Sequence, residues 1–216
     1  MMHMTEPAPD LTFRERMSGP LAMGATDPME GATQANAARF TMHCTISVDD
    51  MDAFTRDAAH TARLEARVSY PPLGKELPVQ QGHFNLFRNA EEPGTKLMSY
   101  GLRFGAKGRE YFLEGTKTLR DEPGFDLWRD TTRLYCYLHE GPDARGPVVG
   151  AGVLTLGKRA LVELLGSMRS SRHGTAGFGA VSHFGRFFLG TLWDVYAPWA
   201  RQAGEAPSAS SMERSL

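Results

Sequence analysis

The chain has 216 residues, a formal net charge of -1 at pH 7 and an apolar fraction of 41%. This length suits one folded domain with appendages, and it is sufficient to bury a core without disulfide bonds or metal ions. The nearly balanced charge argues against nucleic acid as a partner. The first ten residues show no basic segment followed by an apolar run, so we expect a soluble, cytoplasmic protein without a secretory signal.

The first half of the chain alternates apolar and polar side chains in four segments, a pattern typical of strands. In chain order these segments are Leu11–Met17, Phe40–Val48, Arg63–Tyr70 and a short run around His83–Phe87. Residues 1–10 are expected to be disordered. The Gly- and Met-rich segment Ser18–Ala38 is interpreted as a long loop. A short helix, capped by Asp49 or Asp50, is predicted after the second strand.

The second half begins with a predicted β-hairpin and continues with two more strands. Leu97–Phe104 and Arg109–Leu119 alternate, and the intervening Gly105–Gly108 allows the positive φ values of a tight turn. Thr131–Leu138 is rich in β-branched and aromatic residues, which favour strands. Pro147–Leu156 is a further strand with two glycines inside it, as at a bend in a barrel.

Two helices are predicted near the C-terminus, at Lys158–Met168 and Thr175–Trp199, because apolar residues recur there at intervals of three and four. The second helix carries aromatic side chains on more than one face, and its charged residues argue against a membrane span. It is therefore buried in its own domain, docked on a partner protein or in contact with a membrane surface. Residues 200–216 are expected to be a disordered tail.

These elements predict an all-β domain at residues 11–156 with two appended C-terminal helices at residues 157–199, packed on or beside it. Eight or nine strands with short connections favour an antiparallel meander. Such a sheet protects its edges best by closing into a lipocalin-like β-barrel, which can hold one small ligand. A two-sheet β-sandwich is the alternative architecture.

Two charged residues, Glu15 and Lys117, fall on the apolar faces of their predicted strands. Because burial of an unpaired charge is unfavourable, one hypothesis is that they meet inside the barrel and orient the polar end of a ligand. The alternative is that strand twist lets each charge reach water. The full set of residues predicted to line the cavity is Glu15, Tyr100, Tyr111, Lys117, Trp128, Asp130 and Thr132.

No catalytic or cofactor motif is visible in the sequence. The seven histidines include no pair at the spacing of helical metal ligands and no Cys/His cluster, so no metal site is predicted. There is no phosphate-binding loop, dinucleotide fingerprint or nucleophile elbow, and we expect no cofactor. Cys44 and Cys136 each lie in a predicted strand and are interpreted as buried thiols in a reducing compartment, with a disulfide as the alternative.

Five segments, read together, carry a family resemblance. They are LTFRERMSG, FTMHCTISVDDMDAF, GHFNLF, YFLEGTKTLRDEPGFDLWRDTTRLY and FGRFFLGTLWDVY, and the most specific part is the series Lys117, Asp121, Asp126, Trp128, Asp130, Thr131 and Thr132 with its Gly115. The string, over most of residues 11–197, resembles a domain found beside or fused to bacterial cholesterol-oxidase-like flavoproteins of the glucose-methanol-choline group. Since their flavin domain is absent from this sequence, the resemblance implies an accessory module and assigns no catalytic residue.

Three functions remain open from the sequence. The first is an accessory module that binds an apolar small molecule, sterol or lipid-like, and works with a flavin-dependent oxidoreductase. The second is a cofactor-free isomerase or cyclase of lipid-derived compounds, in which Lys117, Glu15 or Asp130 acts as acid or base. The third is a protein-docking domain that uses the last helix.

Overall fold

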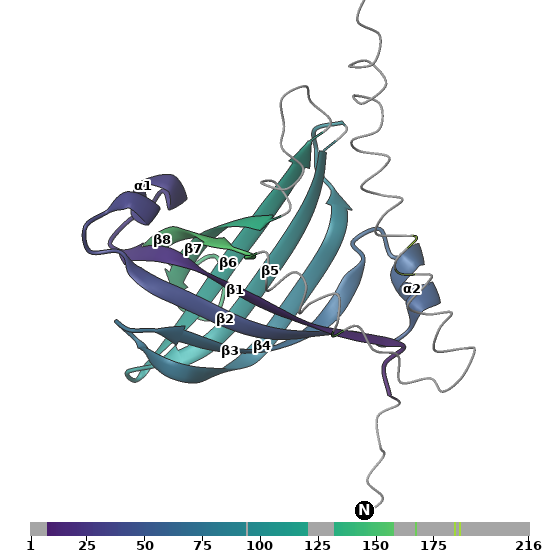
Figure 1. The fold of residues 1–216 in the computed structure, drawn as a ribbon, viewed down its shortest axis with the longest axis horizontal. Helices are drawn as coiled ribbons and strands as arrows, with labels where there is room; N and C mark the ends of the chain where they lie inside the picture. Colours follow the sequence, from purple (N-terminus) through teal and green to yellow (C-terminus); the bar gives the residue numbers. More distant parts are fainter. Residues whose placement is uncertain are drawn as a thin grey trace, which may run out of the picture.

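The computed structural model describes residues 8–93, 95–120 and 132–157, together with residues 167, 184 and 186. Within these residues the chain forms eight strands and two short helices (Figure 1). The strands are β1 (Leu11–Met23), β2 (Ala38–Val48), β3 (Thr61–Tyr70), β4 (Gly74–Asn89), β5 (Thr95–Ala106), β6 (Arg109–Arg120), β7 (Arg133–Glu140) and β8 (Val148–Thr155). The helices are α1 (Pro28–Thr33) and α2 (Met51–Arg56).

The eight strands form a closed antiparallel barrel. Each strand pairs with the next one along the chain, and β1 also pairs with β8, so the sheet has no free edge. This closure confirms the predicted antiparallel barrel and shows that the β-sandwich alternative is wrong. The two predicted C-terminal helices lie outside the described residues apart from residues 167, 184 and 186.

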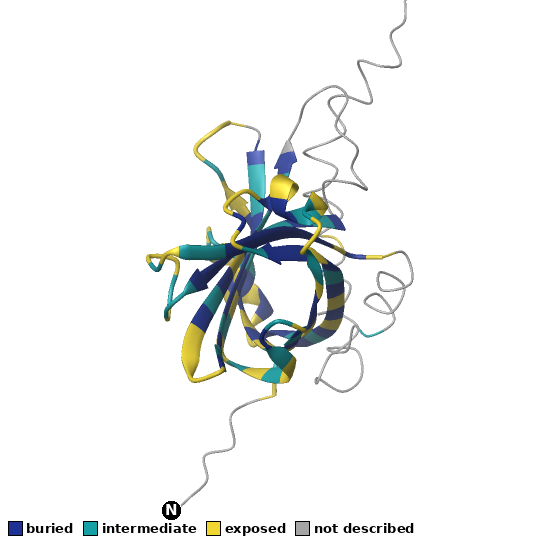
Figure 2. Cartoon of the chain, turned by 90° about the vertical axis from the view of Figure 1, so that its left-hand side faces the viewer, coloured by how far each residue is buried: buried dark blue, intermediate teal, exposed yellow. Residues whose placement is uncertain are grey.

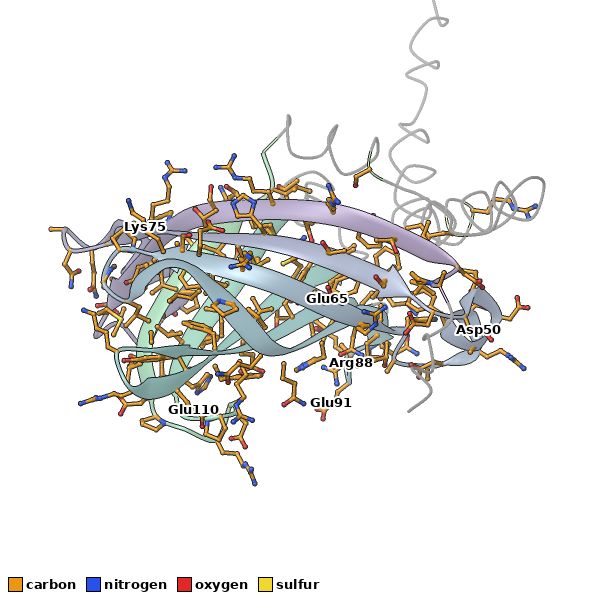
Figure 3. All side chains as sticks on the ribbon, turned by 90° about the horizontal axis from the view of Figure 1, so that it is seen from below. Asp50, Glu65, Lys75, Arg88, Glu91 and Glu110 are labelled. Carbon is orange, nitrogen blue, oxygen red and sulfur yellow. The ribbon has the colours of Figure 1, made fainter. Side chains whose placement is uncertain are left out.

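Alternation along the strands separates an apolar interior from a polar outer surface. Along β1, for example, Leu11, Phe13 and Met17 are buried at every second position while the arginines between them face outward. Figure 2 shows this as bands of buried and exposed residues along the strands. Charged side chains such as Glu65 and Glu110 lie on the outside of the barrel (Figure 3).

The two helices lie at opposite ends of the barrel (Figure 1). Asp50, one of the two predicted capping residues, caps helix α2: its carboxylate accepts a hydrogen bond from the backbone N–H of Ala53. The loop expected over Ser18–Ala38 is corrected: β1 continues to Met23 and α1 lies within the segment. Glycine and proline at positions 19 and 20 are typical of turns, but here they lie where two strands approach closely.

Small residues allow β1 and β8 to close the barrel. A Cβ atom at Gly152 would lie 2.2 Å from the carbonyl oxygen of Pro20 and 2.5 Å from the Cα of Leu21. A Cβ atom at Gly19 would lie 2.1 Å from the carbonyl oxygen of Val153. Both distances are far below van der Waals contact, and the neighbouring atoms belong to the backbone. The closure between these two strands therefore requires glycine at both positions.

We expect Gly152→Ala to lower the free energy of unfolding by about 1–3 kcal/mol, because the added methyl group forces the backbones of β1 and β8 apart. Gly157→Ala is the control, since a Cβ atom there meets no atom within 4 Å, and its effect should stay within about 0.5 kcal/mol. Urea denaturation followed by circular dichroism measures both. Equal effects of the two substitutions would contradict the close approach of the strands.

Candidate functional site

A carboxylate, an ammonium group and a phenol meet inside the barrel. The Nζ atom of Lys117 lies 3.2 Å from Oε1 of Glu15, and the hydroxyl of Tyr100 donates to Oε2 of Glu15 at 2.7 Å. Lys117 also donates to the hydroxyl oxygen of Tyr100 at 3.3 Å. The side chains of Lys117 and Glu15 are only 3% and 2% exposed. We call these three residues the Glu–Lys–Tyr cluster.

The barrel brings the cluster together from opposite walls. Tyr100 on β5 pairs with Gly115 on β6, so Lys117 two residues further is its diagonal neighbour on the same face. Glu15 comes from β1, which is separated from β6 by β7 and β8 on one side of the barrel. The contact therefore spans the interior, and it joins residues 102 positions apart in the sequence.

Apolar side chains surround the cluster on both sides. Toward α2, the rings of Phe84 and Tyr100 lie with centroids 4.8 Å apart, and Phe13 lies 6.5 Å from Phe84. Toward α1, the ring of Phe40 lies 5.4 Å from that of Tyr70 and 6.5 Å from that of Phe104. Because such surroundings screen charges poorly, the interactions within the cluster are stronger than they would be on the surface.

Burial changes the acidity of the neutral groups beside the ion pair. Burial, together with the adjacent negative charge of Glu15, raises the pKa of Tyr100 well above its usual value. Burial also raises the pKa values of Cys44 and Cys136, which are free thiols. At neutral pH the phenol of Tyr100 is therefore a hydrogen-bond donor and both thiols are protonated.

The ion pair is a weak source of stability. Two charges lose their hydration when they are buried, and replacement of such a pair by apolar residues of similar volume is often neutral or stabilising. Loss of one partner is different, because the remaining charge is left buried and unpaired. A cluster of this kind in an apolar interior is therefore a candidate for a binding or catalytic role.

The structure brings three of the predicted lining residues together and separates Tyr111 from them. Glu15, Tyr100 and Lys117 form the cluster, which confirms that the two charges meet inside the barrel. Tyr111 is buried on the same strand as Lys117 but six residues away, about 20 Å along the strand, and it stacks on Phe104.

The remaining predicted residues are Thr132, Trp128 and Asp130. Thr132 is buried immediately before β7, and its carbonyl oxygen accepts a hydrogen bond from the backbone N–H of Leu156 at 2.9 Å. Trp128 and Asp130 lie outside the described residues.

Sequence reasoning missed the neighbours of the cluster. Cys44 pairs with Glu15 across β1 and β2, and Cys136 pairs with Gly115 across β6 and β7. Both cysteines were predicted to be buried, but not to lie beside the charges. An antiparallel alignment of Leu11–Met17 with Phe40–Val48, in which Leu11 pairs with Val48, places Cys44 opposite Glu15.

A second feature is a pocket of about 270 Å³ beside α2, at one end of the barrel. Its three carboxylates already have structural partners: Asp49 pairs with Arg63, Asp50 caps α2, and Asp57 accepts from the backbone N–H groups of two following residues. Those backbone bonds lower the pKa of Asp57. The volume is also slightly below the ~300 Å³ at which ligand sites usually begin.

The described residues thus define a class of protein: a closed, eight-stranded antiparallel barrel with an ionic cluster in its apolar interior. Comparison of the chain with protein-family models, curated proteins and solved structures finds no match. Among the described residues no helix has the length and apolar character needed to cross a membrane. The same residues include no group of His, Cys, Asp and Glu arranged to hold a metal ion.

We expect Lys117→Met alone to lower the free energy of unfolding by about 3–5 kcal/mol, because it leaves the carboxylate of Glu15 buried without its cation. The double variant Glu15→Leu/Lys117→Met should recover most of this loss, since it replaces both charges by apolar groups. Urea denaturation at pH 7 measures both variants.

The matched control is the surface pair of Arg103 and Glu110, whose side chains are 34% and 44% exposed. Removal of that pair should change the free energy of unfolding by less than about 1 kcal/mol. A double variant of the cluster that is no more stable than Lys117→Met would contradict the assignment of a costly buried charge.

The raised pKa of Tyr100 predicts an alkaline loss of stability. The folded protein holds the phenolic proton more tightly than the unfolded chain, in which tyrosine ionises near pH 10. The resulting stabilisation is complete below about pH 10 and decreases as the pH rises above it. The stability of Tyr100→Phe should therefore fall less steeply above pH 10 than that of the wild type, as measured by urea denaturation across the alkaline range. Parallel curves would be the contrary result.

Proposed function

We propose that the protein binds an apolar small molecule, sterol or lipid-like, inside its barrel, with the molecule's polar end at the Glu–Lys–Tyr cluster. The observation that carries this proposal is the burial of that cluster in an otherwise apolar interior. Sites for small molecules combine an apolar lining with a few precisely placed polar groups. An eight-stranded barrel is wide enough either to be filled by its own side chains or to hold one small ligand.

The proposal explains a feature that stability does not. The interior side chains next to Glu15 along β1, Phe13 and Met17, are apolar, and an apolar residue at position 15 would continue the pattern. A buried ion pair contributes little net stability, so its placement at mid-barrel requires another reason. Recognition of a polar group on an otherwise apolar molecule is one such reason, beside the selection of strand register.

The proposed partner rests on the sequence alone. The resemblance to domains that accompany cholesterol-oxidase-like flavoproteins supports an accessory role beside a flavin-dependent oxidoreductase in the cytoplasm. Docking on a partner protein or contact with a membrane surface is proposed for the helix expected at residues 175–199, which lies outside the described residues apart from positions 184 and 186.

A second candidate function, an isomerase or cyclase activity on the bound molecule, is favoured by the contact of Glu15 with Lys117. A carboxylate can accept a proton from a substrate, and the ammonium group of Lys117 can donate a hydrogen bond to a developing oxyanion. The two groups lie 3.2 Å apart, so one substrate group can contact both of them. Recovery of the bound molecule in two isomeric forms, interconverted by fresh protein, would select this activity over simple binding.

Native mass spectrometry tests the binding proposal. Protein purified from cells should carry one apolar molecule per chain, identified after solvent extraction, and the Glu15→Leu/Lys117→Met variant should carry less of it. Protein freed of lipid by unfolding and refolding should bind the apolar fluorophore N-phenyl-1-naphthylamine saturably at one site per chain. The variant should bind this fluorophore as well, because the probe needs only the apolar interior.

The surface variant Arg103→Ala/Glu110→Ala is the control and should behave as the wild type in both measurements. The proposal is overturned if the purified protein carries no apolar molecule and the refolded protein shows no saturable uptake of the fluorophore.

A further inference from the structure

We infer that the polar group received by the Glu–Lys–Tyr cluster is an uncharged oxygen, a hydroxyl or a carbonyl. The ligand would then be a neutral oxygenated molecule and not an ionised fatty acid or amine. This inference rests on the proposed function and narrows its ligand class. It follows from two properties of the cluster: its net charge and its unused hydrogen-bonding capacity.

The charges of the cluster already cancel. The cation of Lys117 is matched by the anion of Glu15 at 3.2 Å, and among the described residues no other charged side chain shares their part of the interior. The buried Asp10 lies before β1 and accepts a hydrogen bond from the first residue of α2. A bound carboxylate would therefore give the interior a net negative charge, and an ammonium a net positive one. Either is strongly unfavourable in apolar surroundings, whereas a neutral group is not.

The hydrogen bonds of the cluster leave one donor available. A lysine ammonium has three N–H groups, and Lys117 directs two of them to Glu15 at 3.2 Å and to the hydroxyl of Tyr100 at 3.3 Å. For the third N–H, the described residues offer no acceptor beyond the ring of Tyr100, whose centroid is 5.2 Å from Nζ. A ligand oxygen would accept this hydrogen bond, which is charge-assisted and therefore strong.

The other two residues define what else the ligand group can do. The hydroxyl hydrogen of Tyr100 is directed to Glu15 at 2.7 Å and is not available to a ligand. Each carboxylate oxygen of Glu15 accepts one hydrogen bond within the cluster and has a lone pair left. A ligand hydroxyl can accept from Lys117 and donate to Glu15, whereas a carbonyl can only accept. Both groups fit the site, and an alcohol uses more of it.

The test compares ligands of equal chain length in the refolded, lipid-free protein. Displacement of N-phenyl-1-naphthylamine at pH 7.5 gives the affinities of 1-dodecanol, 2-dodecanone, dodecanoate and dodecylammonium. We expect the alcohol and the ketone to bind the wild type at least tenfold more tightly than either ion. Because neutral molecules enter any apolar site more readily, variants must separate this general preference from recognition by the cluster.

Two variants make that separation. In Glu15→Leu/Lys117→Met, which removes the donor but keeps the interior neutral, the alcohol and the ketone should bind at least about tenfold more weakly, because the charge-assisted hydrogen bond from Lys117 is lost. In Glu15→Gln, the unpaired Lys117 should now favour the anion, so dodecanoate should bind at least tenfold more tightly than in the wild type. If that variant unfolds on its own, dodecanoate should restore its folding, because the anion binds only the folded state.

The outcomes distinguish failure of this inference from failure of the proposed binding of an apolar molecule. Dodecanoate binding the wild type as tightly as the alcohol, or unchanged alcohol and ketone affinities in the double variant, would overturn the inference and leave apolar binding intact. The inference also fails, with apolar binding retained, if the fluorophore binds but none of the four ligands displaces it. Failure of the fluorophore to bind at all would instead remove the proposed function.

Discussion

The contact between Lys117 and Glu15 crosses the interior of the barrel and constrains the structure around it. The two charges come from opposite walls, so their 3.2 Å separation depends on the diameter of the closed sheet. That diameter depends in turn on the close approach of β1 and β8, which Gly19 and Gly152 permit. A side chain at either position would move β1, and Glu15 with it, relative to β6. The glycines and the ion pair are thus parts of one geometrical requirement.

The same contact selects the register of β1. Arg14 and Arg16 flank Glu15, and both now face outward. A shift by one residue would turn an arginine inward beside Lys117. Two positive charges would then be buried side by side and would lose their hydration. An apolar residue at position 15 would make such a slip less unfavourable. The buried pair therefore specifies one pairing of β1 with its neighbours, a role that buried polar groups have in some other folds.

The sequence predicted which strand faces line the interior better than it predicted the contacts between side chains across that interior. Strict alternation placed Glu15 and Lys117 on apolar faces, and a closed barrel then required them to share an interior. Alternation says nothing about contacts across that interior, so the bond from Tyr100 to Glu15 could not be derived. Two strand segments could not be predicted because they contain turn-forming residues. Strand β1 extends through Gly19 and Pro20, and β4 begins at Gly74, well before the predicted strand around Phe84. Shifts in the register of β4 with both neighbours explain its irregular pattern.

A purely structural ion pair and a binding site differ in how completely their hydrogen bonds are satisfied. Buried polar groups in folded proteins nearly always have their partners, because an unmet donor in apolar surroundings is unfavourable. Within the cluster Tyr100 donates its only hydroxyl hydrogen and both oxygens of Glu15 accept a hydrogen bond. One N–H of Lys117, however, has no acceptor among the described residues other than the ring of Tyr100. Aromatic groups lie on either side, toward α1 and toward α2, so these contacts lie in apolar surroundings. An oxygen atom of a bound ligand would accept the remaining hydrogen bond of Lys117 without altering the net charge of the cluster. This property links the fold to the proposed function.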